Sequence, residues 1–176
     1  MASPINNART PSGRTRGVVY VHDAGKAFCK PIEWTLSEVL GYEALLHWIP
    51  QPITPGRMRA EISWVGPAGA GNRIVQALQQ IPELRFEVTE EPSVGCEGER
   101  FAFTPTLGVF RAHMSVHGDV LVTEQRIRNV LEATDDPVVL RNAFGLMLGV
   151  AWDRELEPFR IAGEGTPVRW LHKVAL

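Results

Sequence analysis

Polar and apolar side chains alternate strictly over residues 57–64, within an expected strand at residues 57–65. Successive side chains of a β-strand point to opposite faces, so this pattern predicts a strand with one polar face and one core face. The positions expected to face the core are Met58, Ala60, Ile62 and Trp64. A sheet with one apolar side therefore has to be the centre of the fold.

The segments around this strand predict two helices and three further strands. Strands are expected over residues 17–22, 44–49 and 84–89. The first helix is expected to begin at Lys30-Pro31 and to end at Gly41, and a second helix, marked by Ile74, Leu78 and Ile81, is expected to end at Pro82. The first helix has an apolar stripe of Ile32, Leu36, Val39 and Leu40, and Trp34 is also expected in the core. The order β-α-β-β-α-β is the ferredoxin-like arrangement. In it, two helices cover one face, and the other face is expected to meet water or a partner with Arg57, Arg59, Glu61, Arg85 and Glu87.

The second half of the chain predicts a β-hairpin and two more helices. Strands are expected over residues 100–104 and 109–122, with a turn at Gly118-Asp119. Thr123 and Asp135-Asp136-Pro137 are helix starts, and Gly149 is a helix stop. The apolar sides of these helices are Ile127, Val130 and Leu131, then Leu140, Phe144, Met147 and Leu148. Residues 152–176 are expected to be irregular and aromatic, with a short strand at Val168–Val174.

The predicted fold class is therefore α+β, a ferredoxin-like antiparallel sheet extended by a hairpin, two helices and an irregular segment. The expected organisation is a flexible basic tail (1–16), a βαββαβ unit (17–92) and an extension on the same core (93–176). A length of 176 residues fits one such domain.

Composition excludes several classes of protein. A formal charge of −2 gives no basic footprint for nucleic acid. No apolar run approaches the roughly 20 residues of a membrane span. Cys29 and Cys96 are far apart and form no C-x-x-C motif, so two reduced thiols and a cytoplasmic location are expected.

Residues 86–105 carry an acidic loop between two predicted strands, with Glu90, Glu91, Glu97 and Glu99. Such a loop suits acid–base chemistry, cation binding or recognition of a partner, and it is also typical of a solvated loop that pairs with nearby arginines. No metal-ligand spacing, nucleophile motif or phosphate-binding motif accompanies it. The glycines before the second helix predict a plain turn. We therefore predict no catalytic residues, no cofactor and no metal.

If the acidic loop recognises a protein partner, a set of residues is expected to form the contact. They are Glu90, Glu91, Glu97, Glu99, Arg100, Trp152, Arg160, Trp170 and His172. A rival reading is a small-molecule binder or enzyme for acyl or phosphorylated ligands, with a pocket around His22, Glu90 and Arg100. A third reading is a homo-oligomer that uses the open sheet face.

Several segments also carry a specific literal pattern between about Gly17 and Val174. They are Gly17–His22, Pro50–Pro52, Phe86–Ser93, Glu97–Arg100, Thr104–Pro105, Leu107–Gly108, Gly118–Asp119, Leu156–Arg160, Gly163–Gly165 and Pro167–His172. Together they resemble a small actinobacterial family catalogued as a domain of unknown function (domain of unknown function 3145). The resemblance brings no catalytic residues, but it implies a genomic setting near fatty-acid synthesis genes. The expected function is a non-catalytic accessory or regulatory protein that binds an enzyme of fatty-acid or mycolic-acid synthesis, above all a β-ketoacyl synthase.

Overall fold

The computed structural model describes residues 13–162, which form an antiparallel seven-stranded sheet and five α-helices. The strands are β1 (Arg14–Gly25), β2 (Ile49–Pro50), β3 (Arg57–Pro67), β4 (Arg85–Glu90), β5 (Gly98–Thr104), β6 (Gly108–Met114) and β7 (Val120–Leu121). The helices are α1 (Cys29–Leu40), α2 (Ala70–Leu78), α3 (Glu124–Ala133), α4 (Pro137–Leu148) and α5 (Val150–Ile161). The spatial order is β2-β3-β1-β4-β5-β6-β7, so the fold is α+β.

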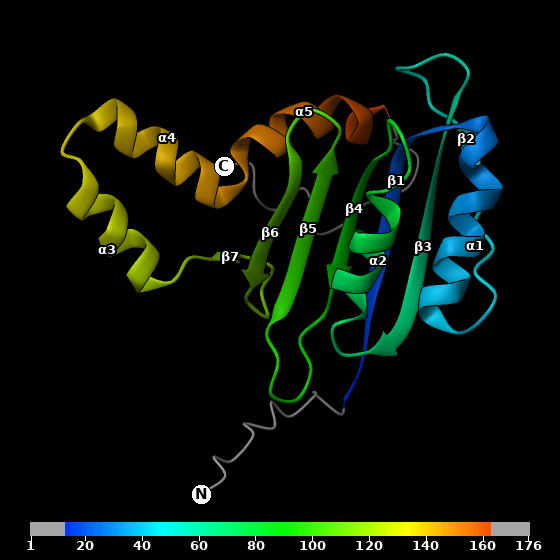
Figure 1. Ribbon diagram of the computed structural model, residues 1–176, viewed down its shortest axis with the longest axis horizontal. Coiled ribbons are helices and arrows are strands. Elements are labelled where there is room, and N and C mark those ends of the chain that lie inside the picture. Colours follow the sequence, from blue (N-terminus) through cyan, green and yellow to red (C-terminus); the bar gives the residue numbers. More distant parts are fainter. Residues whose placement is uncertain (1–12, 163–176) are drawn as a thin grey trace, which may run out of the picture.

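The main core lies between one face of the sheet and the helices α1 and α2, which pack side by side on that face (Figure 1). In the sheet, Val19 is paired with Val88 and Val21 with Phe86, so these four side chains share one face. All of them are buried. The helices add Ile32, Leu36, Ile74 and Leu78, and the neighbouring strands add Trp64 and Phe101. The alternating strand expected at residues 57–65 is confirmed as part of β3.

Trp34 was expected in the core, and that prediction is wrong. Trp34 is 69% exposed, because it lies two positions from Ile32 and therefore on the opposite side of α1. A helix residue joins the buried stripe only at a spacing of three or four from its members.

The strand expected at residues 44–49 forms only at Ile49–Pro50. Glu33 explains the difference, because its buried carboxylate on α1 accepts hydrogen bonds from the Leu46 backbone amide (3.2 Å) and the Trp48 indole (3.0 Å). The Ala44 amide likewise donates to the Ser37 hydroxyl at 2.8 Å. The backbone amides of this segment therefore donate hydrogen bonds to side chains of α1 rather than to a neighbouring strand.

The second face of the sheet is covered in part by α5, where an open polar face and an irregular segment had been expected. Leu156 of α5 is fully buried against Ala102, Phe110 and Ala112, and Trp152 donates its indole hydrogen to the Gly108 carbonyl at 2.9 Å. The prediction of an irregular chain is therefore wrong for residues 152–161, which belong to α5. The expected strand at Val168–Val174, and the candidates Trp170 and His172, lie outside the described residues.

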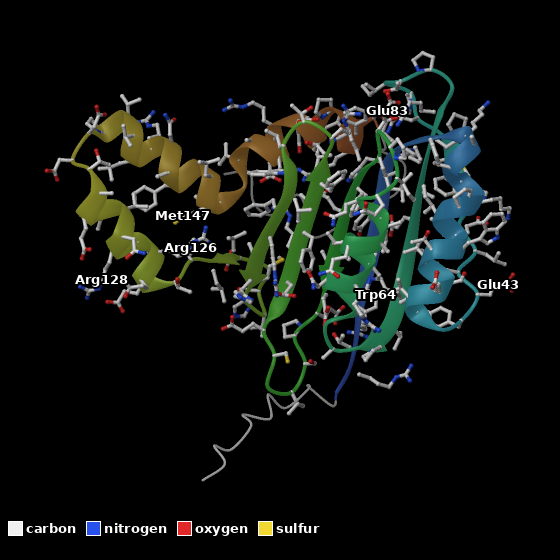
Figure 2. The ribbon with its side chains drawn as sticks, viewed as in Figure 1. Glu43, Trp64, Glu83, Arg126, Arg128 and Met147 are labelled. Carbon is white, nitrogen blue, oxygen red and sulfur yellow. The ribbon has the colours of Figure 1, made fainter. Side chains whose placement is uncertain are left out.

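Helices α3 and α4 extend away from the sheet beyond β7 (Figure 1). We call residues 124–148 the α3–α4 arm. Figure 2 shows Arg128 of α3 and Glu43, next to α1, at opposite ends of the molecule. The helix boundaries agree with the sequence, because Asp136 caps α4 through the amides of Val138 and Val139, and Gly149 ends it with a φ of 78°. None of the helices in residues 13–162 has both the length and the apolar character needed to cross a membrane.

Candidate functional site

Glu90 of the acidic loop faces the inside of the protein. Its carboxylate accepts hydrogen bonds from the amides of Gly69 (2.6 Å) and Gly71 (2.8 Å), at the start of α2. A helix N-terminus attracts anions through its unpaired amides and its dipole. The protein's own carboxylate therefore fills the place a phosphate would take, and it joins β4 to the start of α2. A contact of Glu90 with a partner stays a prediction.

The other three glutamates lie away from the start of α2. Glu99 is buried and its carboxylate binds the Arg111 guanidinium at 2.5 Å, whereas Glu91 forms an exposed ion pair with Arg16 at 2.7 Å. Glu97 is exposed, and the carboxylates of Glu97 and Glu99 both lie 3.7 Å from the His113 Nδ1 atom. The four carboxylates thus form no common site. A contact role for the exposed Glu91 and Glu97 stays a prediction.

The strongest concentration of charge lies on the second face of the sheet, around Glu87. This residue is 0% exposed. Its carboxylate accepts two hydrogen bonds from Arg160 (2.9 and 2.6 Å), one from Arg100 (3.0 Å) and one from the His22 Nε2 atom (2.8 Å). Asp153 of α5 binds both Arg100 and Arg160. We call these five residues the Glu87 cluster.

The cluster keeps its carboxylate ionised. Burial alone would raise the pKa of Glu87, but the Arg160 charge, the His22 hydrogen bond and the Arg100 charge lower it well below its ordinary value. Burial would lower the pKa of Arg160 and of Arg100, yet Glu87 and Asp153 raise both. An ionised carboxylate only accepts hydrogen bonds, so the Nε2 atom of His22 carries the hydrogen.

A second set of ion pairs also joins α5 to the sheet. Asp23 is buried and binds Arg57 and Arg85, and Arg85 continues to Glu155 at 3.3 Å. A register shift in β1 next to His22 brings Asp23 opposite Arg85. The Arg85 guanidinium also lies over the Phe159 ring, 5.1 Å from its centre. These contacts make α5 part of the rigid scaffold.

The structure separates the residues of the pocket that the sequence suggested. His22 and Arg100 meet at Glu87, whereas Glu90 lies on the opposite face of the sheet beside α2. Of the partner candidates, Arg100 and Arg160 are held in the Glu87 cluster, and Trp152 packs on Phe110. Within residues 13–162, no three His, Cys, Asp or Glu side chains come together so as to hold a metal ion.

The α3–α4 arm is the most unusual surface of the molecule. α4 was expected to have a buried stripe of Leu140, Phe144, Met147 and Leu148, but only Met147 of these is buried. α3 buries none of its residues. Large apolar side chains remain exposed along the arm and at the start of α5, namely Leu131, Val138, Val139, Leu146, Leu148 and Val150.

The composition of α4 makes this exposure informative. Arg141 and Asn142 are its only polar residues, and apolar side chains occupy nearly its whole circumference. A helix that is apolar all round is normally buried, and large exposed apolar patches mark interaction sites. Val139, Ala143 and Leu146 follow the i, i+4, i+7 spacing with which a helix enters the groove of a partner. The sequence feature that indicates this surface is the absence of a polar face on α4.

Comparison with known proteins identifies a family but no characterised relative. No match to the chain was found among the curated proteins or among the solved structures. A family model described as "Protein of unknown function (DUF3145)" matches residues 18–173, which is most of the chain. The chain therefore belongs to the DUF3145 family of proteins of unknown function.

Proposed function

We propose that this protein is a non-catalytic accessory protein that binds another protein through its α3–α4 arm. The observation that carries the proposal is the exposure of α4, an apolar helix that its own chain leaves largely uncovered. Covering such a helix removes apolar surface from water, which is the dominant favourable term in most protein association.

The proposed partner is an enzyme of fatty-acid or mycolic-acid synthesis, above all a β-ketoacyl synthase, as the family resemblance implies. The rigid sheet and the tethered α5 would act as a base that presents the arm. The encounter would take place in the cytoplasm, in keeping with Cys29 and Cys96, which are both free thiols. We also propose that residues 14–90 are a ferredoxin-like unit, supported by their antiparallel strand order β2-β3-β1-β4.

Charge on the exposed stripe of α4 should weaken this binding strongly. We expect the double variant Val139→Glu/Leu146→Glu to bind a purified β-ketoacyl synthase about 100-fold more weakly than the native protein, because two central apolar anchors each contribute on the order of 1–2 kcal/mol or more. The two residues are 49% and 59% exposed, so folding should be little affected. Isothermal titration calorimetry measures the affinities, and thermal unfolding checks the fold.

The matched control is Ile53→Glu, because Ile53 is also 49% exposed but lies in the loop between β2 and β3. It should bind like the native protein. No binding of any β-ketoacyl synthase by the native chain contradicts the partner. Light scattering that shows a homodimer, which the double variant dissociates, would instead assign the arm to self-association.

A further inference from the structure

Helix α5 crosses the second face of the sheet from β6 toward β1 (Figure 1). Near the start of the helix, Trp152 packs on Phe110 of β6. Near its end, Arg160 binds Glu87 of β4 and lines a pocket together with residues of β1 and β3. Since β1 and β3 are the next strands in this direction, the end of α5 directs the chain toward the half of the second face that these two strands form.

The second face is exposed along β3. Glu61, Ser63 and Val65 alternate with Ile62 and Trp64, which pack in the main core, so the first three residues lie on the second face. All three are exposed, and the exposed fraction of Val65 is 45%. A sheet normally packs against a second layer. α5 provides that layer over the neighbouring strands, and the surface along β3 has room for a further segment.

A pocket of about 350 Å³ opens on this face at the end of α5. Its walls include Phe159 of α5, Tyr20 of β1, His47 before β2 and Ile49 in β2. Flat aromatic and aliphatic walls suit an indole ring, which buries a large apolar body while its N–H meets a polar group. The hydroxyl of Ser63, which also lines the pocket, is such a group. The lining therefore fits a tryptophan side chain.

Residues 163–176 follow α5 directly, and their sequence supplies such a side chain. The large apolar residues of this segment include Val168, Trp170, Leu171 and Val174. Trp170 follows Ala162 by eight positions, and an extended chain of that length spans up to about 26 Å. The pocket begins at Phe159, within one helical turn of Ala162, so the segment can reach it. The family model continues to residue 173, so most of this segment belongs to the family's domain.

We propose that residues 163–176 pack on the second face along β1 and β3, with the Trp170 side chain in the pocket beside Phe159. Trp170 is tethered close to the pocket, so its docking costs less translational and rotational freedom than the binding of a separate ligand. A second hollow at the last turn of α5 is lined by Ile53, Pro158 and other residues, none of them aromatic among those described. The aromatic walls therefore favour the first pocket. In this arrangement Trp170 belongs to the second face and is not a contact for the partner of the α3–α4 arm.

A spin label in the full chain tests this placement. The label is attached to Lys173→Cys in a background of Cys29→Ser and Cys96→Ser, and NMR compares the amide signals with the label oxidised and reduced. We expect the strongest broadening outside α5 at the amides of residues 18–20 and 61–63, and none on the α3–α4 arm. Strongest broadening near Ile53 and Arg154, broadening of the arm, or no broadening outside α5 overturns the proposal.

Two substitutions test whether Trp170 and the pocket account for the docking. Trp170→Ala should weaken the broadening at β1 and β3 several-fold, because it removes the anchor. Ser63→Trp should do the same, because a bulky side chain in the wall fills the pocket. The matched control is Trp34→Ala, since Trp34 is 69% exposed on α1, and it should leave the broadening unchanged. Unchanged broadening in Ser63→Trp contradicts the site even if Trp170→Ala does not fold.

Discussion

Replacing Glu87 with Gln should lower the free energy of unfolding by about 3–5 kcal/mol, which is the usual cost of removing one partner from a buried ion pair. The amide keeps the size of the side chain but leaves the charges of Arg100 and Arg160 under-compensated in the interior. It also places a donor where the carboxylate accepted four hydrogen bonds. Urea unfolding measures the change.

The matched control is Glu83→Gln. Glu83 also pairs with an arginine, Arg57, but its side chain is largely exposed, so the loss should be about 0–1 kcal/mol. Equal effects of the two substitutions would show that Glu87 is not a structural centre of the second face.

The pH dependence of unfolding gives a second test of the role of Glu87. The pKa of Glu87 is lowered in the folded state, so its stabilisation is complete above the ordinary pKa of 4.5 and is lost progressively as the pH falls from there toward the folded pKa. The free energy of unfolding should decrease in this window by up to about 1.4 kcal/mol per pH unit from this group. Glu87→Gln should lack that part of the slope.

Replacing Gly17 with Val should destabilise the protein by about 3 kcal/mol or more. A Cβ atom at this position would lie 1.7 Å from the Thr89 carbonyl oxygen and 2.7 Å from the Trp64 ring. The first of these atoms belongs to the backbone of β4, so a rotamer change cannot relieve the clash, and overpacking on this scale reaches the upper end of the usual range. Thermal and urea unfolding test this, and a native-like stability would contradict the β1–β4 register.

Gly145 of α4 is the opposite control. A Cβ there meets nothing closer than Val150, at 3.9 Å. Alanine should therefore stabilise the helix by about 0.5–1 kcal/mol, because glycine loses more backbone freedom on folding. The two substitutions therefore compare a glycine required by the close approach of β1 and β4 with a glycine that its surroundings do not require.

Regular periodicity made much of the sheet predictable from the sequence. The alternation in residues 57–64 identified β3 and placed Trp64 on the core face, and the strand expected at residues 84–89 corresponds to β4. Asp136 and Gly149 correctly marked the ends of α4, because helix caps depend on local backbone chemistry. These signals need no knowledge of distant contacts.

The second face could not be predicted because it depends on α5. Pro158 lies inside that helix, and a proline usually ends one, so the local sequence gives no clear signal for α5. Without α5, Glu87 is expected to meet water or a partner, although Arg160 in fact neutralises it across 73 residues of chain. The hydrogen bonds between Glu90 and the start of α2 could not be predicted either, because their partners are also far apart in the sequence. Long-range ion pairs leave no periodic signal.

Whether a partner covers α4 is tested most directly by hydrogen–deuterium exchange of the full chain, measured with and without a purified β-ketoacyl synthase. Backbone amides of the arm have few buried contacts to protect them in the free protein. The synthase should slow exchange across residues 137–148 and leave the amides of β3 and β4 unchanged. Binding that leaves exchange in α4 unaltered, or that protects only the acidic loop at residues 91–97, would contradict it.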